Sequence, residues 1–169
     1  MHQLCLAIKY IHSYGVAHRD LKLDNILLVD DNENSTIRLC DFGLSKIVGP
    51  SEKCDESYGS LCYTAPEIID HLPYNKQVDL WSIGIINYTL CCGKFPFYDK
   101  DTNILMDKIV ENDVDFDFEN FNNYSKEMKD FIYKLLKKEP EKRMNVIEAL
   151  KHSWFKKMNK KSNNFNILS

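Results

Sequence analysis

The run from Val78 to Leu90 limits the possible folds of this chain more than any other feature. Its residues are apolar almost all round a helix. A surface helix shows one apolar stripe, whereas a helix that is apolar on every side has to be buried on every side. We therefore predict a central helix over Val78–Leu90, with other elements packed around it. The most apolar stretch, Leu80–Cys92, is too short to span a bilayer.

Helical patterns occupy most of the remaining sequence, and they surround a small β element. Apolar residues recur at helical spacing before Gly15, near Thr102–Glu111 and after Val146. A further apolar stripe follows Ser125, a good N-cap, and we expect Pro140 to end that helix. We predict two short strands, a turn between them and a long surface loop. The strands are Ile26–Val29 and Thr36–Cys40, the turn is Asp30–Ser35 and the loop is Gly43–Thr64.

Composition places the chain among ordinary globular proteins and excludes some functions. Its 169 residues suffice for one compact domain, and 44% of them are hydrophobic. A net charge of −3 argues against a nucleic-acid or membrane-surface role, since both need a strong positive field. The six cysteines form no C-x-x-C pair and no zinc ligand pattern. With no signal peptide visible, we expect reduced thiols in a cytoplasmic or nuclear protein.

Three motifs in a fixed order carry the chemistry. The segment His18-Arg19-Asp20-Leu21-Lys22-Leu23-Asp24-Asn25 resembles the protein-kinase catalytic loop H-R-D-L-x-x-x-N at every fixed position. Asp41-Phe42-Gly43 resembles the metal-binding motif of the same family, and Ala65-Pro66-Glu67 resembles the motif that closes its activation loop. Lys22, two residues after Asp20, is the serine/threonine-kinase form of the loop. The chain therefore resembles the C-terminal lobe of a eukaryotic serine/threonine protein kinase.

The resemblance implies ATP and Mg²⁺ as cofactors and gives roles to four residues. Asp20 would orient the substrate hydroxyl and accept its proton, while Lys22 would offset charge on the γ-phosphate. Asn25 and Asp41 would supply oxygen ligands to Mg²⁺. Ser60 stands where the family usually has threonine, facing the substrate and the catalytic pair. The resemblance also implies structural roles for His18, Phe42, Gly43, Glu67, Asp79 and Arg143, with Asp79 holding the catalytic loop and Arg143 pairing with Glu67.

The resemblance also suggests regulation and a class of substrate. Arg19 would pair with a phosphate on the activation loop, for which the candidate acceptors are Ser51, Ser57, Tyr58 and Ser60. Asp24 would lie near a basic substrate residue, so we expect a protein substrate with Arg or Lys on the N-terminal side of the phosphoacceptor. Mapping of phosphosites and a peptide array would test these two hypotheses.

The resemblance covers nearly the whole chain. We expect a kinase C-lobe over residues 1–155 and a polar, mobile tail over residues 156–169, in a mainly α fold with a short β element around the catalytic loop. Phe42–Ser45, Gly93–Tyr98 and Glu148–Phe155 are most similar to the calcium/calmodulin-dependent and calcium-dependent kinase group.

The sequence contains no G-x-G-x-x-G loop and no strand lysine before His18. We therefore expect that the β-rich N-terminal lobe is absent and that the isolated chain is inactive. A non-catalytic kinase-like scaffold or docking module is the alternative.

Overall fold

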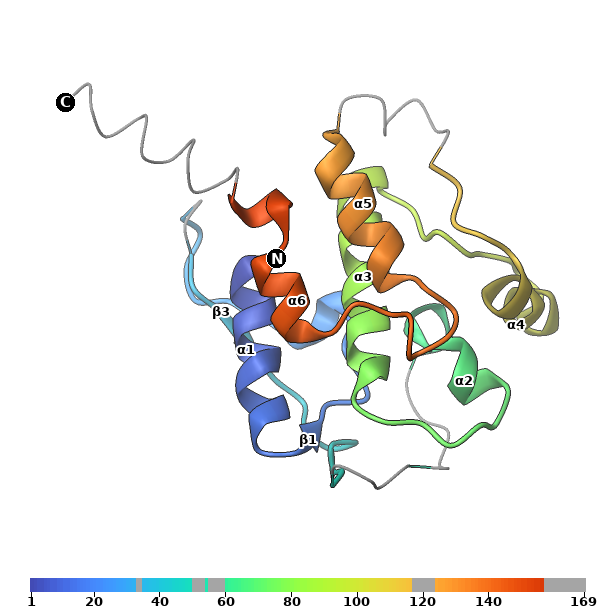
Figure 1. Cartoon of the computed structure of the whole chain (residues 1–169), viewed down its shortest axis with the longest axis horizontal. Coiled ribbons are helices and arrows are strands. Elements are labelled where there is room, and N and C mark those ends of the chain that lie inside the picture. The colour runs from blue at the N-terminus through green and yellow to red at the C-terminus, as the bar shows by residue number, and fades with distance from the viewer. Residues whose placement is uncertain (33–34, 50–53, 55–59, 117–123, 157–169) are drawn as a thin grey trace.

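The computed structural model describes residues 1–32, 35–49, 54, 60–116 and 124–156. Helix α3 runs through the middle, with α1 and α6 on one side, α2 and α4 on the other and α5 packed along it (Figure 1). The predicted mainly α fold with a short β element is confirmed. The helices are α1 (His2–Ser13), α2 (Pro66–Ile69), α3 (Gln77–Cys92), α4 (Thr102–Glu111), α5 (Lys126–Leu135) and α6 (Val146–Lys151).

Helix α3 is the core of the molecule. Buried residues occur on all its sides, among them Leu80, Trp81, Ile83 and Ile86. It packs most extensively against α5 and ends at Gly93, whose φ of 70° is the left-handed conformation that glycine adopts without strain. The buried central helix predicted over Val78–Leu90 is confirmed.

Helices α4, α5 and α6 begin at the polar caps Asp101, Ser125 and Asn145. The Ser125 side chain accepts a hydrogen bond from the Met128 N–H at 3.3 Å, and Asn145 forms a capping box with Glu148 at the start of α6. Pro140 does not end α5, which stops at Leu135 with Leu136 as its cap. The chain leaves the helix early because the carbonyls of Lys137 and Lys138 turn to accept hydrogen bonds from the guanidinium of Arg143.

Two small antiparallel β-ladders lie between residues 16 and 47. Strand β2 (Ile26–Leu28) pairs with β3 (Ile37–Leu39) in the register Ile26↔Leu39. Strand β1 (Val16–Ala17) pairs with β4 (Lys46–Ile47), so this ladder closes the segment that holds the first two motifs.

The segment Gly43–Thr64, predicted as loop, contains more regular structure than expected. Strand β4 and the 3₁₀ turn η2 (Leu61–Tyr63) lie in it, and Cys54 forms an isolated β-bridge with Tyr74. Elements of two or three residues are too short to show a period in the sequence. The hydrogen bonds of η2 are local, whereas β4 and the Cys54 bridge form because a distant partner supplies theirs.

The described residues contain no helix with the length and apolar character that a membrane span needs. The six cysteines are free thiols. Burial raises the pKa of Cys5 to about 12 and that of Cys91 to about 11, so both thiols stay protonated at neutral pH.

Candidate active site

The segment after β1 is held by the buried carboxylate of Asp79 on α3. One carboxylate oxygen accepts the His18 backbone N–H at 2.9 Å, and the other accepts the Arg19 backbone N–H at 3.0 Å. His12 of α1 also contacts this carboxylate, at 2.8 Å from Nε2. Arg19 has a φ of +68°, a conformation that is strained for a residue with a side chain. The Asp79 contacts therefore fix an unfavourable turn that directs the following residues.

Four predicted site residues meet at this turn. The ammonium of Lys22 lies 2.8 Å from an Asp20 carboxylate oxygen and 3.4 Å from the Ser60 hydroxyl. The Asn25 side-chain amide donates to the Asp20 carbonyl at 2.8 Å and to its carboxylate at 3.2 Å. Asp20 and Asn25 are buried. The hydrogen bond to Asp20 raises the pKa of Lys22, so the ammonium stays charged at neutral pH. A fixed carboxylate and a fixed cation therefore stand side by side.

The 3₁₀ turn η1 (Leu23–Asn25) explains how Asn25 reaches Asp20. This turn follows Lys22 directly and leads into β2, so residues five apart in the chain come into contact. Asp24 lies on the same turn but is exposed to solvent. It takes no part in the hydrogen bonds that join Asp20, Lys22, Asn25 and Ser60.

The second motif follows β3. The Cys40 N–H donates to the Asn25 carbonyl at 3.0 Å, so the ladder places Asn25 and Asp41 at the same end of the β2–β3 hairpin. Asp41 has a φ of +60° and its carboxylate accepts the Gly43 N–H at 3.3 Å. The ring of Phe42 lies 4.8 Å from that of His18, which itself contacts the Cys40 carbonyl at 3.2 Å. His18 thus ties the two motifs together.

The donor atoms at this end of the hairpin suit a hard divalent cation. The Asn25 amide nitrogen makes the contacts to Asp20, which leaves its amide oxygen as the atom for a metal ion. Asp41 is exposed and adds a carboxylate oxygen. Oxygen ligands of this kind, few in number and completed by phosphate oxygens, are typical of magnesium sites in phosphoryl-transfer enzymes. The residues present therefore fit Mg²⁺.

The regulatory candidates are only partly within the described residues. Ser51, Ser57 and Tyr58 lie outside them. The Arg19 guanidinium donates to the Leu44 carbonyl at 2.6 Å and to the Tyr74 hydroxyl at 3.1 Å. These contacts link the catalytic loop to the residues after Gly43 and to the segment before α3. Neither Tyr74 nor His12 was predicted from the sequence, because neither residue belongs to a motif and each makes its contact across more than 50 residues.

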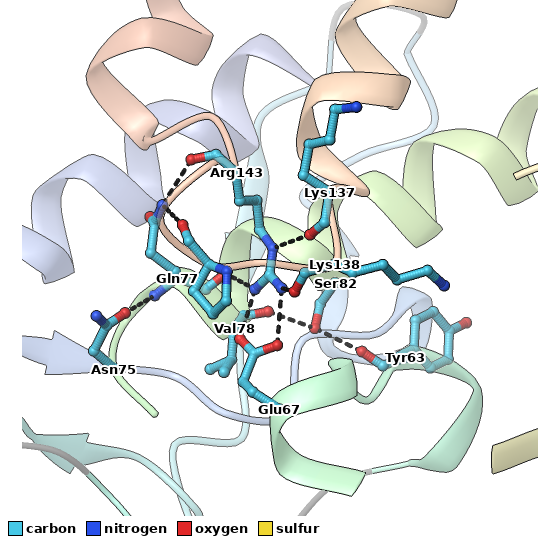
Figure 2. Close-up of polar contacts among 10 residues, drawn as sticks. Tyr63, Glu67, Asn75, Gln77, Val78, Ser82, Lys137, Lys138 and Arg143 are labelled. Carbon is cyan, nitrogen blue, oxygen red and sulfur yellow. Dashed lines mark hydrogen bonds and ion pairs between the residues drawn. The ribbon is translucent and has the colours of Figure 1, made fainter. Parts of the chain in front are cut away.

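The third motif is joined to the far end of the chain by a buried ion pair (Figure 2). Arg143 donates to both carboxylate oxygens of Glu67, at 2.7 and 2.8 Å. Its other donors reach the carbonyls of Gln77, Lys137 and Lys138 at 3.0 Å each. All five N–H groups of the guanidinium are thus satisfied, which is what a buried charge requires. The pair fixes α2, and with it the end of the segment that carries Ser60.

Comparison with known proteins agrees with this geometry. The model of the family described as "Protein kinase domain" matches residues 1–155. The chain belongs to the protein kinase family. Myosin light chain kinase A of Dictyostelium discoideum is 42% identical over 158 residues, which make up 94% of this chain and 53% of that protein. A CDPK-related protein kinase of Daucus carota is 40% identical over 159 residues, 94% of this chain and 26% of the relative.

The kinase family predicted from the three motifs is confirmed. The names of these relatives agree with the predicted calcium/calmodulin-dependent and calcium-dependent kinase group. The chain spans between about a quarter and about half of the length of these two relatives.

Proposed function

We propose that the protein containing these residues is a serine/threonine kinase, which transfers the γ-phosphate of ATP to a hydroxyl group of a protein substrate. The observation that carries the proposal is the contact of Asp20 with both Lys22 and Asn25, at 2.8 and 3.2 Å, on a strained turn fixed by Asp79. A chain used only for binding has no physical need for this arrangement. Membership of the kinase family supports the same reaction.

In this proposal Asp20 orients the substrate hydroxyl and receives its proton as the oxygen attacks phosphorus. The bond from the γ-phosphorus to the bridging oxygen of ADP breaks, and Lys22 offsets the negative charge on the transferred group. Ser60, 3.4 Å from the Lys22 ammonium, helps to hold that side chain toward the substrate. Asn25 and Asp41 would hold Mg²⁺, which supplies positive charge to the phosphates.

The 169 residues contain no glycine-rich loop and no strand lysine before His18. Binding of ATP in kinases draws on both groups. We therefore propose that the isolated chain transfers phosphate at no useful rate, and that activity requires a β-rich lobe that supplies these groups. Rapid turnover by the purified 169-residue chain would contradict this part of the proposal.

We propose further that a phosphate on the activation loop joins the contacts of Arg19, and that Asp24 favours a basic residue before the phosphoacceptor. The guanidinium of Arg19 already faces Leu44, at the start of that loop. Asp24 is exposed beside Lys22, where an approaching peptide can reach it. An active protein with an unmodified loop would contradict the first idea, and a peptide array without basic preference would contradict the second.

The experiment that tests the proposed function is ATP-dependent phosphorylation of a serine/threonine peptide library by the native-length protein. Asp20→Asn should lower kcat by about 10²- to 10⁴-fold with little change in KM, because it removes a proton acceptor used in the chemical step. Asp31→Asn, an exposed carboxylate on the β2–β3 hairpin, is the matched control. Equal activity of the Asp20→Asn variant and the wild type would refute phosphoryl transfer at this site.

A further inference from the structure

A second recess lies on a part of the surface that the candidate site does not use. A cavity of about 440 Å³ opens between α2, the end of α4 and the segment 138–141. Leu72, Val110 and Pro140 give it an apolar lining, and Asp70 and Glu141 add carboxylates. We name this recess the α2–α4 groove. Its volume falls in the range of about 300–1,000 Å³ that is usual for ligand pockets.

The walls of the α2–α4 groove are fixed by the ion pair described above. Arg143 binds Glu67 on one wall and the carbonyl of Lys138 on the other (Figure 2). The two walls therefore cannot separate without breaking a buried, fully hydrogen-bonded charge pair. A groove that is already formed before binding requires little ordering when a partner enters, and this favours affinity.

The charges left in the groove are negative. Glu67 is neutralised by Arg143, and Glu139 lies 2.9 Å from the ammonium of Lys142. The ammonium of Lys138 turns toward α4, where it donates to the Ile109 carbonyl and lies 4.3 Å from the centre of the Phe97 ring. Within the described part of the chain, Asp70 and Glu141 form no ion pair. Two exposed carboxylates thus flank an apolar recess.

We propose that the α2–α4 groove binds a short segment of a partner protein in which a leucine-sized side chain has lysine or arginine on both sides. The apolar side chain would fill the recess beside Leu72 and Val110, and the basic residues would face Asp70 and Glu141. The complementary charges provide specificity for the partner, and the apolar contact provides most of the affinity. The inference does not depend on phosphoryl transfer, because Asp20, Lys22, Asn25 and Asp41 are not among the lining residues.

The test uses the purified chain and a fluorescein-labelled probe peptide, Gly-Arg-Gly-Leu-Gly-Arg-Gly, which has no side-chain hydroxyl and cannot be phosphorylated. Fluorescence anisotropy should show saturable binding that weakens as salt is added. Alanine in place of the leucine of the peptide should weaken binding about fiftyfold, since it removes about three buried carbons. Asp70→Asn and Glu141→Gln should each weaken it about three- to fivefold.

Asp31→Asn on the β2–β3 hairpin makes the same charge change outside the groove and should leave the affinity unchanged. Circular dichroism melts would show whether each variant is folded. If one groove variant does not fold, the other still tests the proposal. The proposal is overturned by no binding up to millimolar peptide, or by equal affinity of Asp70→Asn, Glu141→Gln and the wild type. Concentration-dependent dimers that Asp70→Asn abolishes would overturn it too, since the groove would then hold a second copy of the chain.

Discussion

At the scale of single residues, Asp79 shows how much of the candidate site depends on one buried carboxylate. It receives hydrogen bonds from the backbone of His18 and of Arg19 and contacts the ring of His12. The positive φ of Arg19 persists because these contacts outweigh its strain, which is of the order of 1–3 kcal/mol. The direction in which Asp20 points therefore follows from a residue about 60 positions away.

Asp79→Ala should destabilise the chain by about 3 kcal/mol, because it leaves two backbone N–H groups without an acceptor in a buried position. Urea unfolding followed by circular dichroism would measure the change. Asp107→Ala, at an exposed position of α4, is the control and should stay within about 0.5 kcal/mol of the wild type. A loss for Asp79→Ala as small as that of the control would show that the loop does not need this carboxylate.

The lowered pKa of Lys138 should make the free energy of unfolding depend on pH. Burial lowers its pKa from the ordinary value to about 8. Between pH 8 and the pKa of about 10.4 in the unfolded chain, the unfolded state binds more protons, so the free energy of unfolding rises with pH. The Tm of the wild type relative to Lys138→Met should therefore increase between pH 7.5 and pH 9.5. A constant difference between these two proteins across that interval would contradict the lowered pKa.

At the scale of elements, α3 and α5 pack closely against each other. A Cβ atom added at Gly84 would lie 2.7 Å from Leu136 Cδ2 and 3.0 Å from Leu135 Cβ. The absence of a side chain at Gly84 thus lets the end of α5 approach the central helix. This requirement is one of space, since Gly84 lies inside a regular helix where alanine would otherwise be favoured by about 1 kcal/mol.

Gly84→Ala should therefore destabilise the chain by about 1–3 kcal/mol, as overpacked cores do, in spite of the higher helix propensity of alanine. Chemical denaturation gives the value. Leu136→Ala removes the atoms that collide, so the double variant should lose less than the sum of the two single losses. Strictly additive losses would indicate that the two positions do not touch.

At the scale of the whole molecule, the Glu67–Arg143 pair joins segments that are 76 residues apart. It connects the motif that ends the activation segment to the loop between α5 and α6, and it fixes both walls of the α2–α4 groove. Replacing one partner of this buried pair leaves an isolated buried charge, whereas replacing both partners leaves none.

Arg143→Met should destabilise the chain by about 3–5 kcal/mol, and the double variant Glu67→Gln with Arg143→Met should recover part of that loss. Thermal and urea unfolding would measure both. The carbonyls of Gln77, Lys137 and Lys138 lose their donor in either variant, so recovery should be incomplete. A double variant that is less stable than Arg143→Met would show that the charge on Glu67 is not the cause of the loss.

The sequence by itself determined the family, the order of the motifs and most of the helices. A helix was predicted near Thr102–Glu111, where α4 lies, and Ser125 begins α5 as the predicted N-cap. Such features could be predicted because helix periodicity, caps and motifs depend on neighbours within a few residues.

Only the tertiary structure decided which distant residues complete the site. The contacts of His12 with Asp79 and of Arg19 with Tyr74 join positions more than 50 residues apart, and β4 exists only because β1 pairs with it. The early end of α5 likewise follows from the donors of Arg143 and not from Pro140. No local sequence pattern predicts these partners, because a buried polar group forms its hydrogen bond with whichever group the packed chain places beside it.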